Sequence, residues 1–364
     1  MAEEEPKGKG AKGQYSKKVE EDFPGEIMLG DKRFIKRIPL RYGFNPGCPA
    51  AFYEEEGASG TNLAGIEVLQ EGTKGLGFIN MEDMDYSLRI VEKMQIVFPG
   101  KECAAVMKHV NPSGVGLADT VEEAYHKAWD CDSLSAFGSV DCFSGEVGAD
   151  LAKYLADKNR NVEVVVAPAY TPEALEVLAT REPLRVVKIP EFNGVSLDNG
   201  VEYKRVRGGL LVQKRFDSQV VAASNVAVVS ERQPTEEEMQ ACIFNWLVAG
   251  FCRSNTVVFG RADRTVGIGT GQMSRIDAAR LAAYNAENKS DGPAGCVMAS
   301  DAYMPFIDVM KLAAEKGITA AIWPLGSNAD GKVIAEGNRN NIAMLVTRYD
   351  PSKPDQYERC FDHH

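Results

Sequence analysis

The chain has 364 residues, of which 44% are hydrophobic and 26% are charged, and its net charge is −11 at pH 7. These proportions are typical of a globular protein with one large or two medium domains. The acidic balance argues against nucleic-acid and membrane-surface binding, which need a basic face, and no run approaches the about 18 apolar residues of a membrane span.

The first half alternates short apolar runs with amphipathic stretches. Residues 1–25 are largely Lys, Glu, Gly and Pro, which predicts a flexible tail and, without an apolar core, no signal peptide. Buried strands are expected at 103–108 and 161–168. Helices are expected at 121–130, capped by the preceding threonine, and from residue 171, where a threonine cap precedes a proline.

The second half repeats this rhythm. Helices are predicted at 235–249, 274–288, 307–316 and 329–338, and strands at 256–259, 265–268, 295–299, 320–323 and 342–346. The first two strands of this half read as one hairpin. Strands that alternate with helices predict an α/β architecture with layered sheets. The pattern softens around 188–206, which suggests a junction between a unit at 26–205 and a unit at 206–364.

The cysteines and histidines give no metal-binding pattern. The eight cysteines are scattered singly, several within apolar runs, at positions 48, 103, 131, 142, 242, 252, 296 and 360. They are expected to be reduced and mostly buried thiols of a cytoplasmic protein. The four histidines form no His-Cys set at a ligand spacing, so no zinc site is expected.

The pair Lys108-His109 follows a predicted strand and precedes Asn111-Pro-Ser-Gly114, which predicts a turn. A neutral imidazole can take a proton near pH 7, and a neighbouring cation can stabilise an oxyanion. Taken alone, the pair is more typical of a surface lysine and a structural histidine than of a catalytic pair.

Two further polar segments have the same double reading. Arg41-Tyr42 precedes Gly43-Phe-Asn-Pro46 and offers a guanidinium for phosphate beside a stacking ring, or only an ordinary loop. Gly267-Ile-Gly-Thr-Gly-Gln-Met-Ser-Arg275 opens a predicted helix. Its glycines can expose amides to an anion or can serve packing alone, and their spacing matches no dinucleotide or P-loop motif.

Taken together and in order, these segments closely resemble the AICAR transformylase portion of the bifunctional purine biosynthesis protein, which also carries IMP cyclohydrolase. The resemblance runs from about residue 35 to the C-terminus. It rests on Arg41-Tyr-Gly-x-Asn-Pro46, Lys108-His-x-Asn-Pro-x-Gly114, Cys131-Asp-Ser-Leu-Ser-Ala-Phe-Gly138, Ser254-Asn255, Gly267-Ile-Gly-x-Gly-Gln-x-Ser-Arg275, Ser300-Asp-Ala-x-x-Pro-Phe306 and the ending Arg359-x-Phe-x-His363.

The resemblance implies two cytidine-deaminase-like, three-layer α/β/α subdomains without the deaminase zinc. It implies transfer of a formyl group from 10-formyltetrahydrofolate to the 5-amino group of AICAR, giving FAICAR. His109 would be the base, Lys108 would stabilise charge or protonate the departing folate nitrogen, and Asn255 would bind the formyl oxygen.

The resemblance also implies contacts for both substrates. AICAR would contact Arg41, Tyr42, His109, Gly138, Glu163, Asn255, Arg275, Tyr303 and Arg359. The folate would contact Ile276, Asp308, Ser327 and Asn328. Some relatives hold potassium where Ser254 and Asp301 lie, and family members form homodimers with shared active sites.

The sequence departs from the family in several places. No counterpart of the cyclohydrolase domain precedes Arg41, so a stand-alone transformylase with a separate cyclohydrolase partner is expected. Gly47-Cys48 replaces a common His-Gln, Glu163 replaces Asp, Tyr303-Met304 replaces Phe-Phe, and Asp362 replaces a commonly basic residue. Two alternatives stay open: another formyl donor, such as formate activated by ATP, and a non-catalytic AICAR sensor.

Overall fold

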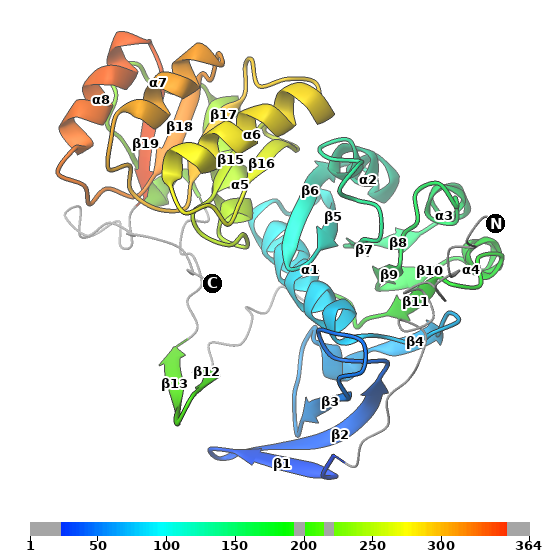
Figure 1. Cartoon of the computed structure of the whole chain (residues 1–364). Coiled ribbons are helices and arrows are strands. Elements are labelled where there is room, and N and C mark those ends of the chain that lie inside the picture. The colour runs from blue at the N-terminus through cyan, green and yellow to red at the C-terminus, as the bar shows by residue number, and fades with distance from the viewer. Residues whose placement is uncertain (1–22, 193–200, 215–221, 348–364) are drawn as a thin grey trace, which may run out of the picture.

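The computed structural model describes residues 23–192, 201–214 and 222–347, which build two six-stranded sheets (Figure 1). The first sheet has the strand order β4-β11-β9-β7-β5-β6, and the second has the order β14-β19-β18-β17-β15-β16. The first half contains β4 (Glu67–Gln70), α1 (Phe78–Val97), β5 (Glu102–Lys108), β6 (Asn111–Ala118), α2 (Val121–Trp129), β7 (Val140–Phe143), β8 (Glu146–Val147), α3 (Ala149–Leu155), β9 (Val164–Ala167), β10 (Ala169–Tyr170), α4 (Pro172–Ala179) and β11 (Arg185–Lys188). The second half contains β14 (Val226–Val228), α5 (Glu236–Ala249), β15 (Val257–Gly260), β16 (Thr265–Gly269), α6 (Arg275–Lys289), β17 (Val297–Ser300), α7 (Asp308–Glu315), β18 (Ala320–Trp323), α8 (Asp330–Arg339) and β19 (Ala343–Thr347).

The two sheets repeat one topology. Each begins with an antiparallel hairpin, β5–β6 or β15–β16, whose first strand also pairs antiparallel with the next strand of the sheet. Two parallel pairings follow, and an antiparallel strand closes the far edge. The helices follow the strands in the same order in both halves. The predicted α/β fold of two layered units is therefore confirmed.

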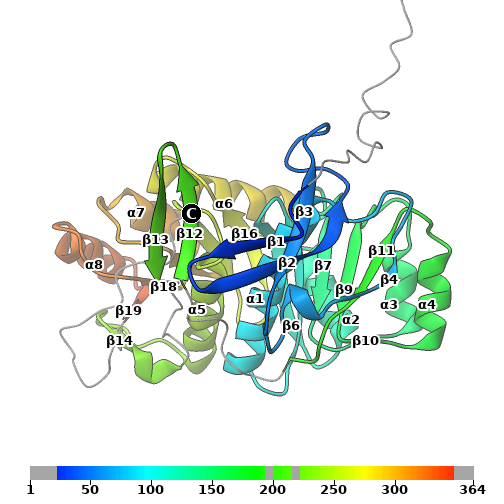
Figure 2. The ribbon, with the colours of Figure 1, turned by 90° about the horizontal axis from the view of Figure 1, so that it is seen from below.

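One core joins the halves. Along β5, Cys103, Ala105 and Met107 face this core, while Ala104 and Val106 face a second core under α2, α3 and α4. The strands of the second sheet divide in the same way between the shared core and a third core under α6, α7 and α8. Helices α1 and α5 pack against each other inside the shared core (Figures 1 and 2).

The helix starts follow their capping residues. Thr120 accepts a hydrogen bond from the Glu123 backbone N–H at 3.2 Å, and Thr171 and Ser274 cap α4 and α6 in the same way. The expected helices of the second half are confirmed to within one or two residues at each end.

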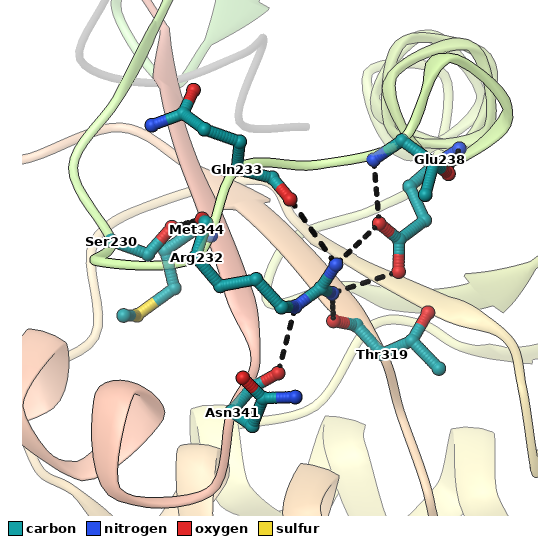
Figure 3. Close-up of polar contacts among 8 residues, drawn as sticks. Ser230, Arg232, Gln233, Glu238, Thr319, Asn341 and Met344 are labelled. Carbon is teal, nitrogen blue, oxygen red and sulfur yellow. Dashed lines mark hydrogen bonds and ion pairs between the residues drawn. The ribbon is translucent and has the colours of Figure 1, made fainter.

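At α5, Thr235 and Glu238 form a reciprocal capping box, with bonds of 2.8 and 3.1 Å. Figure 3 shows Arg232 binding the Glu238 carboxylate with two nitrogens, at 2.9 and 2.8 Å. The same guanidinium donates to the carbonyls of Thr319 and Asn341, just before β18 and β19. One arginine thus fixes the start of α5 against the starts of two strands.

Three small sheets were not expected, and one of them is the short parallel pair of β8 and β10. A three-stranded sheet is formed by β1 (Glu26–Leu29), β2 (Lys32–Leu40) and β3 (Ala50–Glu55), and a separate hairpin by β12 (Val201–Val206) and β13 (Gly209–Lys214). The hairpin stands off from the two large sheets, and Leu211 and Val212 are each 57% exposed. The expected boundary at 205/206 falls inside this hairpin, and the exact division, like the homodimer, stays a prediction.

The described part of the chain contains no helix long and apolar enough to cross a membrane. Within the same residues the cysteines are all free thiols, buried except for Cys48, as predicted. Cys360 and residues 1–22 of the tail expected at 1–25 lie outside the described residues, whereas the backbone carbonyls of residues 23–25 accept hydrogen bonds from Lys36 and Tyr53.

Two of the three glycines in the glycine-rich segment lie in a strand rather than in a loop, which corrects one interpretation of the sequence. Gly267 and Gly269 lie in β16, against α6. A Cβ at Gly269 would come within 1.9 Å of the Ala278 carbonyl oxygen, and at Gly267 within 2.2 Å of the Ala282 oxygen. Only Gly271 lies in the loop before α6, with φ +69°. Close strand–helix packing therefore explains the first two glycines.

Candidate functional site

Lys108 and His109 lie at the tip of the β5–β6 hairpin. Lys108 pairs with Asn111, so the turn consists of His109 and Val110, with φ of 54° and 61°. The turn expected at Asn111–Gly114 is wrong, because these residues open β6, the edge strand of its sheet, where proline is tolerated. A left-handed conformation costs non-glycine residues about 1–2 kcal/mol each, and neither His nor Val signals it in a sequence.

Asn111 ties this turn to the second half of the molecule. Its Nδ2 donates to the His109 carbonyl at 3.0 Å. Its Oδ1 accepts from Thr270 Oγ1 at 3.0 Å and from the Arg253 backbone N–H at 3.3 Å. Arg253 and Thr270 belong to the two segments that pair around Asn255. The segment that carries His109, the expected base, is thus hydrogen-bonded directly to the segments around Asn255, the residue expected to bind the formyl oxygen.

The side chain of Asn255 is held in one orientation. Its Nδ2 donates to the Gln272 carbonyl at 2.8 Å, and its Oδ1 accepts from Arg275 Nη2 at 2.7 Å. One hydrogen of Nδ2 remains for a further acceptor. The Ser254–Asn255 peptide bond is cis.

Arg275 is directed into the protein. It is 7% exposed, and its Nη1 donates to the Thr256 carbonyl at 3.0 Å and to the Asp301 carboxylate. The expected contact between Arg275 and the nucleotide therefore competes with bonds that this guanidinium already makes. In the described structure it orients Asn255.

The expected nucleotide residues of the first half lie together. The Arg41 guanidinium stacks on the Tyr42 ring, 4.3 Å from its centroid, and also bonds the Tyr42 hydroxyl. Glu163 Oε2 accepts from Asn80 at 3.3 Å and lies 3.5 Å from Arg185. Burial lowers the pKa of Arg185, the Glu163 carboxylate opposes this shift, and the nearby Arg41 charge adds to it. Two guanidinium groups against one carboxylate favour an anion here.

Lys108 reaches toward this cluster. Its Nζ donates to the Phe137 carbonyl, next to Gly138. A Cβ at Gly138 would lie 3.7 Å from Lys108 Nζ and 4.0 Å from Glu163 Oε1, and the φ of Gly138 is +86°. The expected residues Lys108, Gly138 and Glu163 are therefore neighbours.

A cavity of 430 Å³ opens beside the turn, between the halves. Lys108 and His109 line it from the first half, and Thr270, Leu281 and Lys289 line it from the second. His109 is exposed. This cavity places the two polar side chains of the turn where a small molecule can reach them.

The remaining expected residues form a separate group. Tyr303, Ser327 and Asn328 line a second cavity, of 640 Å³. Asp308 is the first residue of α7, and Ile276 packs against the core under α6. The structure brings Tyr303 to the expected folate residues rather than to Arg41. Arg359 lies outside the described residues.

No three His, Cys, Asp or Glu side chains gather as a metal site anywhere in the described ranges. Asp301 is paired with Arg275, so its charge is already balanced at the position where potassium was expected. Potassium binding stays a prediction.

The sequence reading missed Asn80, Asp83, Arg185 and Gln272. Asn80 and Asp83 lie on α1, and Asp83 Oδ1 accepts from the Val110 backbone N–H at 2.6 Å. No motif marks these residues, because their roles come from packing between distant segments. A capping pattern was available only for Asn80, which bonds the Gly77 backbone N–H at 2.9 Å.

The geometry defines a class: an α/β protein whose twin sheets meet beside a polar site with an anion-favouring cluster and an exposed imidazole. The family model described as AICARFT/IMPCHase bienzyme matches residues 12–285, and the chain belongs to this family. It is an enzyme family of purine biosynthesis. Tyr303, Asp308, Ser327 and Asn328 lie beyond the matched residues.

Among solved structures, the chain is similar to "Crystal structure of dCMP deaminase from the cyanophage S-TIM5 in apo form". The identity is 18%, the match covers 23% of this chain and 77% of that chain, and the TM-score is 0.20. A likeness of this size adds nothing to the argument on fold or function.

Proposed function

We propose that the protein transfers the formyl group of 10-formyltetrahydrofolate to the 5-amino group of AICAR. The observation that carries the proposal is that Lys108 and His109 line one cavity, and that Asn111 bonds their turn to the two segments that pair around Asn255, in a chain of this family. These three side chains supply a base, a cation and an amide donor, which are the groups that formyl transfer to a weak amine requires.

The reaction proceeds through a tetrahedral intermediate. The amine nitrogen attacks the formyl carbon while His109 accepts the amine proton, and the formyl oxygen becomes an oxyanion. The free Nδ2 hydrogen of Asn255 donates to this oxyanion. Collapse breaks the bond to the folate nitrogen, and Lys108 protonates that nitrogen as tetrahydrofolate leaves.

The Arg41 cluster, which consists of Arg41, Tyr42, Glu163 and Arg185, supports a phosphorylated nucleotide as the acceptor of the formyl group. Arg41 and Arg185 supply positive charge, Tyr42 a ring face, and Glu163 an acceptor for ribose hydroxyls. The longer side chain of Glu163 is itself held by Asn80 and Arg185, so it stays directed into this cluster.

The test is a direct assay of the full chain with AICAR and 10-formyltetrahydrofolate that follows tetrahydrofolate release. His109→Ala should lower kcat by about 10²–10⁴-fold, the usual contribution of a general base, while AICAR binding is retained. His126→Ala is the matched control, since His126 lies on α2 and its ring packs on Tyr154 at 4.6 Å.

Three results would speak against the proposal. A His109→Ala rate close to wild type would remove His109 as the base. AICAR binding without turnover would favour the sensor, and turnover only with formate and ATP would identify another donor.

A further inference from the structure

The turn that carries His109 is held in a conformation that its own residues disfavour. His109 and Val110 are consecutive left-handed residues without a glycine. Two-residue turns of this kind between antiparallel strands normally use Asn-Gly, and a β-branched residue at positive φ is an outlier. Strain of this type persists only where surrounding groups impose it, and it concentrates at functional sites.

Asp83 is one of the groups that impose this left-handed conformation on the turn. This residue lies on α1, is 3% exposed, and accepts the Val110 backbone N–H at 2.6 Å. Burial raises the pKa of Asp83, and its interactions with the backbone of Val110 and His109 and with the His109 charge oppose that rise. One buried carboxylate thus bonds the backbone of Val110 directly and also interacts with the adjoining residue His109.

The turn is fixed on its other side by Asn111, which bonds the His109 carbonyl and the second half of the molecule. Val110 is 6% exposed, so its side chain is packed, while the side chain of His109 is exposed and lines the cavity. Asp83 and Asn111 therefore hold the backbone of the turn from two sides, and the His109 side chain that the turn carries lines the cavity.

We propose that Asp83 is a positioning residue for the transferase reaction, which holds His109 and Val110 in the left-handed turn and so directs the imidazole into the cavity. The inference rests on the proposed function for its kinetic readout, but its geometric part concerns the turn alone. Asp83 reaches the backbone of the turn and lies under it, so it acts through His109 and not on the substrate.

The test combines Asp83→Ala with relief of the strain. Asp83→Ala should lower kcat by about 10²-fold, the effect of a misplaced catalytic group, and change KM for AICAR little, because the Arg41 cluster is untouched. Glycine adopts positive φ freely, so Asp83→Ala/Val110→Gly should regain at least about fivefold in kcat over Asp83→Ala. A purely structural role of Asp83 would give no such recovery, since Val110→Gly removes further buried surface.

Two more variants secure the result. Asp85→Asn, on the same helix and paired with Arg89, should leave kcat unchanged. If Asp83→Ala does not fold, Asp83→Asn replaces it. The amide keeps one oxygen for Val110 but loses the charge, so a smaller loss in kcat and the same recovery with Val110→Gly are expected.

Crystal structures separate this inference from the proposed function. A left-handed His109–Val110 turn that persists unchanged in Asp83→Ala overturns the proposal, whether or not the wild-type chain transfers formyl groups. A wild-type kcat in Asp83→Ala, or a loss that Val110→Gly does not recover, overturns it as well. An absent wild-type activity with a relaxed turn in Asp83→Ala would refute only the proposed reaction.

Discussion

At the residue scale, Asp141 is a second buried carboxyl group with unusual surroundings. It lies in β7 at 0% exposure, and neither carboxylate oxygen has a hydrogen-bond partner. Burial raises its pKa to about 7, although the nearby Ser139 and Tyr125 hydroxyls and the Arg160 charge lower it. An unsatisfied group of this kind makes the folded state prefer the protonated form.

This preference predicts a pH dependence of stability. The unfolded chain releases the Asp141 proton near pH 4 and the folded chain only near pH 7, so stability falls as pH rises between these values. Asp141→Asn cannot ionise and should lack this fall. Relative to wild type, its free energy of unfolding in urea should gain about 2–3 kcal/mol between pH 5 and pH 8. Parallel pH profiles for the two chains would refute the assignment.

At the element scale, most helices and strands of the two large sheets could be predicted from local sequence patterns. Helices α2, α4, α5 and α6 begin where capping residues predicted, because a cap acts on the next three residues of its own chain. Helix α1 was missed, because it lies in the shared core and buries polar as well as apolar residues. The candidate site divides in the same way: Lys108 and His109 stand in a motif, whereas Asp83 and Arg185 reach the site only through tertiary packing.

The strand–helix contacts of the two hairpins lead to a prediction about glycine. Gly269 faces α6 as Gly114 faces α2, and in both cases a Cβ would come within 1.9 Å of a helix carbonyl oxygen. Gly269→Ala should therefore destabilise the protein by about 1–3 kcal/mol or more, as overpacking does. Gly331→Ala is the control, because Gly331 lies in α8 with nothing within 4 Å, and alanine should stabilise that helix. Equal melting temperatures for the two variants would contradict this packing argument.

At the scale of the whole molecule, the repeat explains where the site lies. The edge strands β6 and β16 run antiparallel, with a bridge between Gly116 and Arg264 at one end and the Asn111–Thr270 bond at the other. The His109 turn at the start of β6 therefore lies beside the end of β16, and each half supplies part of the site. A site of this kind depends on the two halves keeping their relative positions.

The shared core predicts that the halves unfold together. Helices α1 and α5 pack in one continuous core, and Lys289 of α6 also binds Asp132 of the first half at 2.7 Å. Separation would expose apolar surface on both halves, so an intermediate with one folded half is disfavoured.

Trp129 is the one tryptophan of the first half, and Trp246 and Trp323 are buried in the second. In Trp129→Phe, fluorescence therefore reports on the second half alone, while circular dichroism reports on both. The two urea transitions should have the same midpoint, and midpoints that differ would mean that the site is built between two independently stable units.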